Sequence, residues 1–253
     1  MISKNSIKLI TSLHHKKFRK REGLFIAEGE KVCREIIHSG WTIEAVYLTE
    51  KFRKEKYVHW VRKLNAETIS EKDFEKISAL TTSPEILVVA KIPERTFEFK
   101  EVENKLSLVL DEIKDPGNLG TIIRIADWFG IETIVCSENC ADVFNPKTVQ
   151  ASMGSLFRVR VFYEDLQSVL KTAREKNMNV YGTLLEGETI YESALTQEGI
   201  IVIGNESNGI HVSLLPFINH RISIPSFSAT EYKAESLNAA MAAAIVCSEF
   251  RRR

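Results

Sequence analysis

Short apolar runs alternate with amphipathic segments along the chain, which is the pattern of β-strands followed by helices. Before residue 95 the segments are short: apolar runs at 24–29, 43–49 and 85–92, and helical patterns at 30–39 and 71–80. In the first of these helices, Val32, Ile36 and Ile37 share one face. We therefore predict a small α/β domain over residues 1–95.

The segment from Pro93 to Lys105 interrupts the alternation, because it is charged, begins with proline and lacks helical periodicity. We predict an interdomain linker there and a second domain over residues 105–253. This part contains apolar runs at 106–113, 132–137, 157–163, 179–187, 200–207 and 221–227, and helical patterns at 121–130, 146–154, 165–177, 211–218 and 235–250. Strands that alternate with amphipathic helices form parallel sheets covered on both faces. The predicted fold class is α/β, and ligands of such sheets bind at the carboxyl ends of the strands.

The composition favours a folded protein and disfavours several classes. With 44% hydrophobic residues in 253 positions, the chain is not disordered as a whole. No apolar stretch reaches the roughly 18 residues that a membrane span needs, and the N-terminus lacks the apolar core of a signal peptide, so we expect a cytoplasmic protein without a membrane partner. The cysteines are too scattered for a disulfide framework: Cys33, Cys136, Cys140 and Cys247. Cys136 and Cys140 have no histidine nearby, and we predict no metal site.

Charge is unevenly distributed although the total is zero. Residues 1–100 hold 20 Lys and Arg against 14 Asp and Glu, a balance of +6, and the remaining residues hold 14 against 20, a balance of −6. The first part is therefore expected to meet an anionic polymer. Its basic run comprises Lys16, Lys17, Arg19, Lys20 and Arg21, beside His14, His15 and Phe18. Such a run fits a phosphate-binding surface, and the alternative is an ordinary solvated helix face.

Three segments of the second part place glycine or polar residues directly after an apolar run: Asp115 to Gly120 with Arg124, Gly204 to Gly209, and Ile224 with Ser236 to Asn238. Glycine there lets backbone groups approach a ligand closely. Each segment alone is also explained by an ordinary turn, with Asn118 and Ser236 as helix N-caps. The chain has no Gly-x-Gly-x-x-Gly, Gly-Lys-Ser/Thr or Gly-x-Ser-x-Gly motif at a strand end. Their absence disfavours dinucleotide-binding, P-loop and α/β-hydrolase enzymes.

Together the three segments resemble the signature motifs of the SpoU (TrmH) family in the SPOUT class of RNA methyltransferases. The matching stretches are NLGTIIRIADWFG, IVIGNESNGI, and ISIP followed by SLNAAMAAAI, within residues 106–250. The first part, with HHKKFRKREGLFIAEGEKVCREI, looks like the L30e-like substrate-binding domain that many members carry. The resemblance implies methyl transfer from S-adenosylmethionine to a ribose 2′-hydroxyl of structured ribosomal or transfer RNA. The basic first domain slightly favours ribosomal RNA.

The family also implies a fold and an assembly. Its members pass the C-terminal segment through a loop to form a deep trefoil knot, an exception to the rule that chains do not thread. The knot builds the cofactor pocket. Motif positions give as its lining residues Thr183, Leu184, Gly204, Ile224 and Leu237. Members act as homodimers whose active site is completed across the interface, and the alanines of the last helix suit close packing there or, equally, inside one subunit.

The resemblance gives five polar residues for catalysis: Asn118, Arg124, Glu206, Ser236 and Asn238. A ribose 2′-hydroxyl is almost fully protonated at neutral pH, so the enzyme must orient it and ease loss of its proton. Arg124 is the strongest candidate, either as general base or as a cation that holds a phosphate and stabilises the developing alkoxide. The second role suits a guanidinium, which rarely gives up its proton. Without the family, Arg124 would be a surface residue paired with Asp127.

One connection departs from the family pattern. The stretch SFSATEYKAE between Pro225 and Ser236 is longer than the usual short turn that contains glycine. Its charged residues are Glu231, Lys233 and Glu235. Phe227 and Tyr232 within it would stack on a base or pack beneath the loop.

Two alternatives stand beside the methyltransferase interpretation. A catalytically silent RNA-binding protein of the same fold has no need of the five polar residues together. A small-molecule enzyme on a doubly wound sheet is disfavoured by the basic first domain and by the missing dinucleotide and phosphate loops.

Overall fold

The computed structural model describes residues 2–56, 61, 64–228 and 235–252, which form two compact units. The first unit consists of Met1–Glu94 with Asp142–Phe157, and the second of Arg95–Ala141 with Arg158–Arg253. The segment Asp142–Phe157 thus comes from the middle of the predicted second domain, which boundaries of 1–95 and 105–253 do not anticipate. Most of the predicted linker belongs to the second unit, where it forms the 3-10 helix η1 (Phe99–Glu101) and buries Val102.

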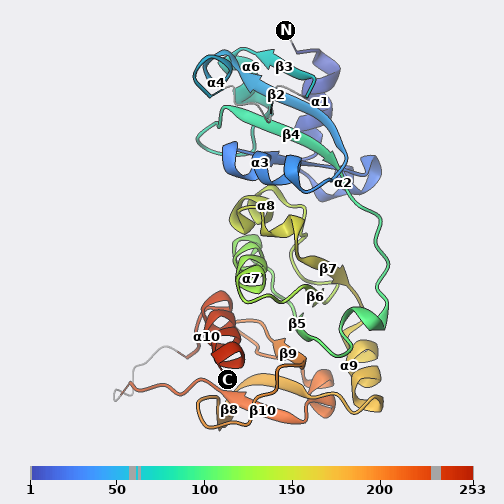
Figure 1. The fold of residues 1–253 in the computed structure, drawn as a ribbon, viewed down its shortest axis with the longest axis vertical. Coiled ribbons are helices and arrows are strands. Elements are labelled where there is room, and N and C mark those ends of the chain that lie inside the picture. Colours follow the sequence, from blue (N-terminus) through green and yellow to red (C-terminus); the bar gives the residue numbers. More distant parts are fainter. Residues whose placement is uncertain (1, 57–60, 62–63, 229–234, 253) are drawn as a thin grey trace. The chain divides into compact units, whose positions relative to one another are not determined.

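The first unit contains a four-stranded sheet of order β1-β4-β2-β3 (Figure 1). β4 is antiparallel to both its neighbours, and β3 is parallel to β2. The strands are β1 (Leu24–Glu28), β2 (Ile43–Thr49), β3 (Ala66–Ile69) and β4 (Ile86–Lys91). The helices are α1 (Lys4–Ser12), α2 (Lys16–Glu22), α3 (Glu30–His38), α4 (Glu50–Lys56), α6 (Glu71–Ile77) and, from the middle of the chain, α8 (Pro146–Ser152) and η2 (Ser155–Phe157). Within residues 1–95, three strands and two helices were predicted, and β3, α1, α2 and α4 were not.

Side chains on the two faces of this sheet build separate cores because they alternate in direction along each strand. On one face, Ile10 and Phe74 from α1 and α6 pack on Ile26 and Val89. On the other, Phe25 of β1 joins a cluster of aromatic rings with Trp41, Phe144 and Phe157. Two of these rings come from Asp142–Phe157, which explains why that segment belongs to the first unit.

The second unit contains a six-stranded sheet of order β10-β8-β9-β5-β6-β7, and every pairing in it is parallel. The strands are β5 (Leu106–Leu110), β6 (Thr133–Cys136), β7 (Arg160–Tyr163), β8 (Val180–Thr189), β9 (Gly199–Ile203) and β10 (His220–Ser223). The helices are α7 (Pro116–Trp128), α9 (Leu166–Glu175), α10 (Ala239–Arg252) and the 3-10 helix η3 (Val212–Phe217). The predicted α/β fold with a parallel sheet is confirmed.

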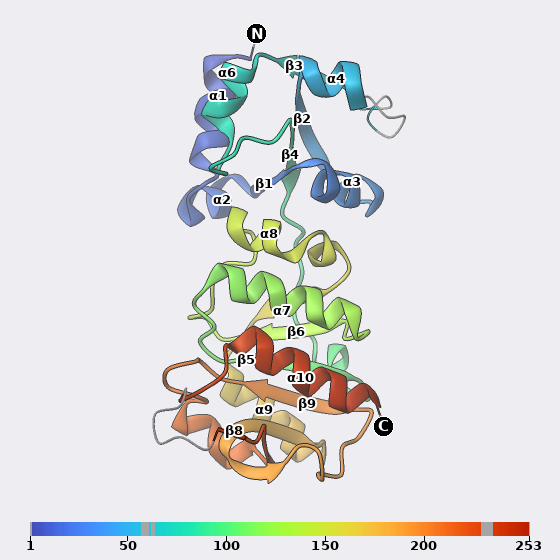
Figure 2. The same cartoon turned by 90° about the vertical axis from the view of Figure 1, so that its left-hand side faces the viewer.

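Helices cover both faces of this sheet. α7 and α10 lie on one face and α9 lies on the other (Figures 1 and 2). Leu214 of η3 packs in the same core cluster as Leu170 of α9. Val109 of β5 packs with Leu170 of α9, whereas Leu108, its neighbour in sequence, points to the opposite face and is also fully buried. Several elements differ from the prediction. β10 ends four residues early, and the predicted helix at 211–218 is a 3-10 helix that contains Pro216. β9 also ends four residues early, α7 begins five residues early and α10 begins four residues late.

Replacing Leu108 by alanine tests the central position of β5. Leu108 is 0% exposed, so Leu108→Ala is expected to lower the free energy of unfolding by about 2–5 kcal/mol. The matched control is Leu185→Ala in β8, where the side chain is 80% exposed and the expected change is below about 0.5 kcal/mol. Urea denaturation measures both, and equal losses would contradict the assignment of β5 to the core.

Candidate active site

Three loops leave the carboxyl edge of the parallel sheet in the second unit. They follow β5, β9 and β10, and each ends at a helix: α7, η3 and α10 respectively. β5 and β9 are parallel neighbours, so their loops begin side by side. β10 is separated from β9 only by β8.

Four of the five predicted catalytic residues are joined by hydrogen bonds at this edge. Asn118 Nδ2 donates to Glu206 Oε1 at 2.5 Å, which joins the loops after β5 and β9. Asn238 Nδ2 donates to Asn118 Oδ1 at 3.0 Å, and Ser236 Oγ donates to the Glu206 main-chain oxygen at 3.0 Å. The three sequence motifs therefore form one polar network, called the edge network below.

Two helix N-termini fix the ends of this network. Asp115 caps α7 and accepts a hydrogen bond from the Asn118 amide at 2.7 Å, with Pro116 in the first turn of the helix. Asn238 caps α10, because its Oδ1 accepts from the Ala240 amide at 3.0 Å. Asn238, and not Ser236 or Asn118, is therefore the cap residue among the three, and its side chain serves helix and network at once.

The loop after β9 folds into a tight hairpin. Asn205 and Gly209 exchange two main-chain hydrogen bonds, at 3.0 and 2.8 Å. A Cβ on Gly204 would lie 2.2 Å from the carbonyl carbon of Gly209, and Gly209 itself has φ of +66°. Both glycines are thus required for the hairpin that presents Glu206, whichever ligand binds there.

Two positioning residues were missed in the sequence. Asn205 Nδ2 donates to the Glu112 main-chain oxygen at 2.9 Å, and Asn205 Oδ1 accepts from the Ser207 amide at 2.8 Å. The carboxylate of Asp111, which is 5% exposed, accepts from the His211 amide at 2.8 Å. Their signal was a carboxylate directly after the buried strand β5 and an amide one glycine beyond the end of β9.

Arg124 lies outside the edge network. It is exposed on α7, and no described residue forms a hydrogen bond or ion pair with its guanidinium. The alternative pairing with Asp127 is not formed, because Asp127 instead binds Arg158 at 2.8–3.1 Å. The Arg124 guanidinium is therefore available to a ligand.

Two of the predicted cofactor residues, Thr183 and Leu184, lie inside β8 (Val180–Thr189). Gly204 and Ile224 directly follow β9 and β10, and Leu237 lies beside the edge network. Thr183 Oγ1 donates to the Val202 main-chain oxygen at 3.0 Å, and Leu184 packs half-buried against the core. Ile224 is half-buried and Leu237 is 47% exposed. Apolar side chains beside main-chain donors and acceptors are the groups that an adenine ring requires. The residues present therefore fit S-adenosylmethionine.

The longer loop is described only in part. Phe227 is 86% exposed, so it does not pack beneath the loop. Glu235 is also exposed. Glu231, Tyr232 and Lys233 lie outside the described residues.

The basic run of the first unit forms α2, and four of its five members point outward. Lys16, Lys17 and Lys20 are exposed, and Arg21 lies over the Phe18 ring at 4.8 Å while pairing with Glu22. Arg19 is the exception: its side chain is 2% exposed and paired with Asp142. Arg19 is therefore not on the predicted RNA-binding surface, because its guanidinium is buried and donates three hydrogen bonds inside the unit.

The neighbouring histidines differ from each other. His15 is exposed at the start of α2. His14 is half-buried, its Nε2 lies 3.1 Å from the Ile77 main-chain oxygen, and burial lowers its pKa. Only His15 thus lies on the surface formed by the lysines.

Other candidate sites are not supported in the described part of the chain. No group of three or more His, Cys, Asp or Glu there is arranged to hold a metal, and no helix there is long and apolar enough to cross a membrane. All four cysteines are buried and free. A hydrogen bond from the Cys136 thiol lowers the pKa of Cys140 to about 7, but Cys140 is only 4% exposed.

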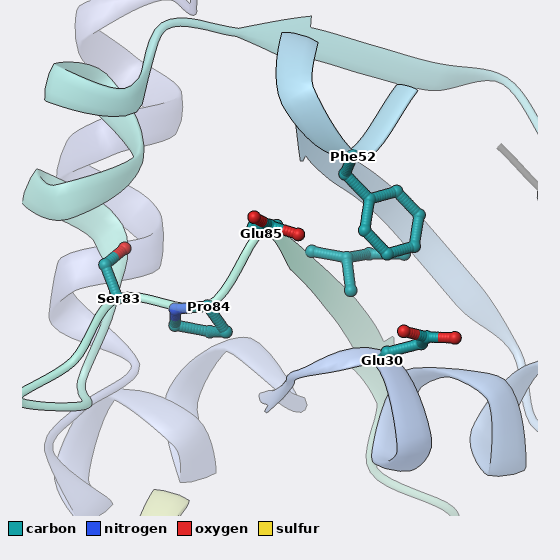
Figure 3. A pocket seen from close by; sticks show the side chains of 6 residues that line it. Glu30, Phe52, Ser83, Pro84 and Glu85 are labelled. Atoms are coloured by element: carbon teal, nitrogen blue, oxygen red, sulfur yellow. The ribbon is translucent and has the colours of Figure 1, made fainter. Parts of the chain in front are cut away.

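A separate cavity of about 290 Å³ lies in the first unit (Figure 3). Its lining residues are Glu30, Phe52, Ser83, Pro84, Glu85 and Ile86. Phe52 is 1% exposed and Glu85 already pairs with Lys51 at 2.7 Å. The cavity contains none of the predicted site residues.

Comparison with solved structures identifies the class of protein that this sheet and its edge network define. A structure from Porphyromonas gingivalis, assigned to the TrmH family of RNA methyltransferases, is 37% identical with a TM-score of 0.85, covering 100% of this chain and 99% of that one. An AdoMet-bound rRNA methyltransferase from Sinorhizobium meliloti is 26% identical with a TM-score of 0.83, covering 100% and 96%. The fold is that of the SPOUT-class RNA methyltransferases.

Sequence comparison then gives the family. Residues 105–248 match the SpoU rRNA Methylase family, and residues 4–88 match the MRM3-like substrate binding domain. The 23S rRNA (guanosine(2553)-2'-O)-methyltransferase RlmP of Bacillus subtilis (strain 168) is 30% identical over 240 residues, which are 94% of this chain and 93% of that protein. The chain belongs to the SpoU rRNA methylase family, which confirms the resemblance of the three motifs.

Gly204→Ala tests the link between the hairpin and the cofactor. The added methyl group would meet the main chain of Gly209 at 2.2 Å, so the hairpin must open. We expect S-adenosylmethionine affinity, measured by calorimetry, to fall at least about tenfold, or about 1.4 kcal/mol. Ser207→Ala in the same loop is the control. It keeps the hydrogen bond from the amide of residue 207 to Asn205 Oδ1, so wild-type affinity is expected. Unchanged affinity of Gly204→Ala would remove the hairpin from the cofactor pocket.

Proposed function

We propose that this protein transfers a methyl group from S-adenosylmethionine to a ribose 2′-hydroxyl of ribosomal RNA, without a metal. The observation that carries the proposal is the edge network, which gathers Asn118, Glu206, Ser236 and Asn238 beside the cofactor residues in a chain of the SpoU family. Ribosomal RNA is favoured over transfer RNA because the Bacillus subtilis relative is named a 23S rRNA methyltransferase and the Sinorhizobium meliloti structure an rRNA methyltransferase. A silent RNA-binding module has no use for this set.

The chemistry forms an oxygen–methyl bond, breaks the sulfur–methyl bond and releases the hydroxyl proton. S-adenosylmethionine, when bound, supplies a methyl group already activated by the sulfonium charge. The protein must therefore orient the hydroxyl and stabilise the negative charge that develops on its oxygen. Arg124 serves as this cation and holds the adjacent phosphate, because its donors are not used by other described residues.

The edge network positions the reacting groups. Asn118 donates to Glu206 and accepts from Asn238, so both ends of its amide are engaged within the protein. Asn118 thus acts as a positioning residue that fixes the loops. Glu206 orders its own loop through the same bonds and through Ser236.

The active site is completed in a homodimer. Six residues along an α-helix turn through about 600°, so Arg124 points to a different side of α7 from Asn118. An Arg124 supplied by a second copy resolves this separation. Trp128 of α7 and Met241 of α10 are 84% and 58% exposed, an apolar surface that a second copy would cover. The proposal includes the family's trefoil knot around the loop after β10 and a cytoplasmic location.

Arg124→Ala tests the reaction and its principal residue. The wild type should transfer radiolabelled methyl from S-adenosylmethionine to ribosomal RNA that lacks modifications, with the label in 2′-O-methyl nucleosides. Loss of the cation should lower kcat about 10²–10³-fold. Arg158→Ala, which removes an arginine paired with Asp127 on the surface, should keep wild-type activity. No label with wild-type protein and no cofactor binding would favour the silent module.

The lysines of α2 give a prediction for RNA affinity. Lys17→Ala and Lys20→Ala each remove an exposed cation, so each should weaken RNA binding regardless of sequence. Each should also flatten the slope of log affinity against log salt by about 1. Lys171→Ala on α9, where the lysine faces Glu175, is the control. Unchanged slopes for both α2 variants would show that phosphates bind elsewhere.

A further inference from the structure

Arg19 differs from the rest of the α2 basic run in its burial and in its partners. Its Nε and Nη2 donate to Asp142 Oδ2 at 3.0 and 2.5 Å, and its Nη1 donates to the Leu13 main-chain oxygen at 2.8 Å. The side chain of Arg19 is 2% exposed and that of Asp142 is 15% exposed. A buried pair of this kind is strongly coupled to its surroundings, since loss of one partner leaves the other charged and unpaired.

Asp142 is itself held firmly. Its second carboxylate oxygen accepts from the Phe144 amide at 3.0 Å. Its main-chain oxygen accepts from the Thr148 hydroxyl at 3.1 Å and from the Asn145 amide at 2.9 Å, at the turn that leads into α8. The Phe144 ring lies 4.9 Å from that of Phe25. The carboxylate that receives Arg19 is therefore fixed by both hydrogen bonds and packing.

α2 needs such an anchor because it is a poor helix by itself. It has only seven residues, its N-cap His15 makes no side-chain capping bond, and its first turn contains no acidic residue. Lys16 and Lys17 instead place positive charge at the positive end of the helix dipole. Short helices are marginal in water, and like charges one turn apart repel. Tertiary contacts must therefore hold α2, and Arg19 provides the charged one.

We propose that Arg19 and Asp142 form a positioning pair for RNA binding. The pair holds α2 so that Lys16, Lys17 and Lys20 face outward, and through it a carboxylate increases the affinity of the protein for a polyanion. This inference rests on the proposed function, because it assumes that the α2 lysines bind RNA phosphates. It also gives the segment Asp142–Phe157 a task in the substrate-binding unit.

The direction in which RNA affinity changes on substitution of Asp142 distinguishes the positioning role from a purely electrostatic effect. Removing a negative charge near an RNA-binding surface should strengthen binding or leave it unchanged. The positioning role predicts that Asp142→Asn weakens RNA binding. The substitution removes the negative charge that pairs with Arg19 and places an NH2 donor opposite the N–H donors of the guanidinium. Asp142→Glu retains the charge and shifts it by one methylene group. It should weaken RNA binding if the position of the carboxylate, and not only its charge, determines how α2 is held.

The test uses the full chain and a 23S ribosomal RNA transcript without modifications. For Asp142→Asn and Asp142→Glu we expect the Kd and KM for RNA to rise at least about fivefold, while kcat and the affinity for S-adenosylmethionine stay within about twofold. Glu22→Gln is the matched control, because Glu22 is a carboxylate on α2 that pairs with Arg21. Its RNA affinity should equal or exceed that of the wild type.

A double-variant cycle distinguishes positioning from direct contact. If Arg19 acts through Asp142, Arg19→Met combined with Asp142→Asn should bind RNA no more weakly than the weaker single variant. If Arg19→Met lowered RNA affinity equally in the wild type and in Asp142→Asn, the proposal would be overturned and Arg19 would be an RNA ligand. Unchanged or tighter RNA binding by both Asp142 variants, at wild-type thermal stability and wild-type methylation, would overturn it as well. A wild type that neither binds nor methylates RNA would overturn the proposed function and this inference together.

Discussion

The amide of Asn118 joins the loops on which the catalytic edge depends. Its Nδ2 donates to Glu206, 88 residues away in sequence, and its Oδ1 accepts from Asn238, 120 residues away. A primary amide is suited to this place because it donates and accepts at once without charge. An aspartate there would set a second carboxylate beside Glu206, and the two like charges would repel. The neutrality of Asn118 thus lets a charged glutamate lie in the network.

The sheet makes this bridge possible. β5 and β9 are parallel neighbours, and main-chain bonds continue their pairing past the strand ends, where the Asp111 amide donates to the Ile203 oxygen at 2.9 Å. Asn205 then ties the β9 loop to the Glu112 oxygen, and the close approach at Gly204 closes the hairpin. Glu206 is placed by these steps in succession. The geometry of the site therefore follows from strand pairing more than from the network side chains alone.

The sequence predicts the parts of the molecule that depend on local pattern. Alternating apolar and amphipathic segments were sufficient for the parallel sheet, and the motifs identified the members of the edge network. Contacts between distant residues were not predictable in the same way. Arg19 was assigned to the surface because it lies in a basic run, and its partner is 123 residues away. The inclusion of Asp142–Phe157 in the first unit was not predicted for the same reason, since Phe144 joins Phe25 only in three dimensions. Pro216 disfavours a regular α-helix after β9, because its ring would clash with the main-chain oxygen of the residue four positions earlier, and the segment is a 3-10 helix instead.

The two arginines singled out in the sequence show what decides the role of a guanidinium. Both have the same five donors and the same charge. Arg19 donates hydrogen bonds to Asp142 and to the Leu13 main-chain oxygen, so its guanidinium stabilises the first unit. Arg124 is exposed and has no partner among the described residues, so its capacity remains for a phosphate or an alkoxide. Arginine within a basic run or a family motif therefore indicates a function only after its hydrogen-bond partners are known. In this protein the partners of Arg19 hold it inside the first unit, whereas Arg124, without a described partner, is available for the role that we propose for it.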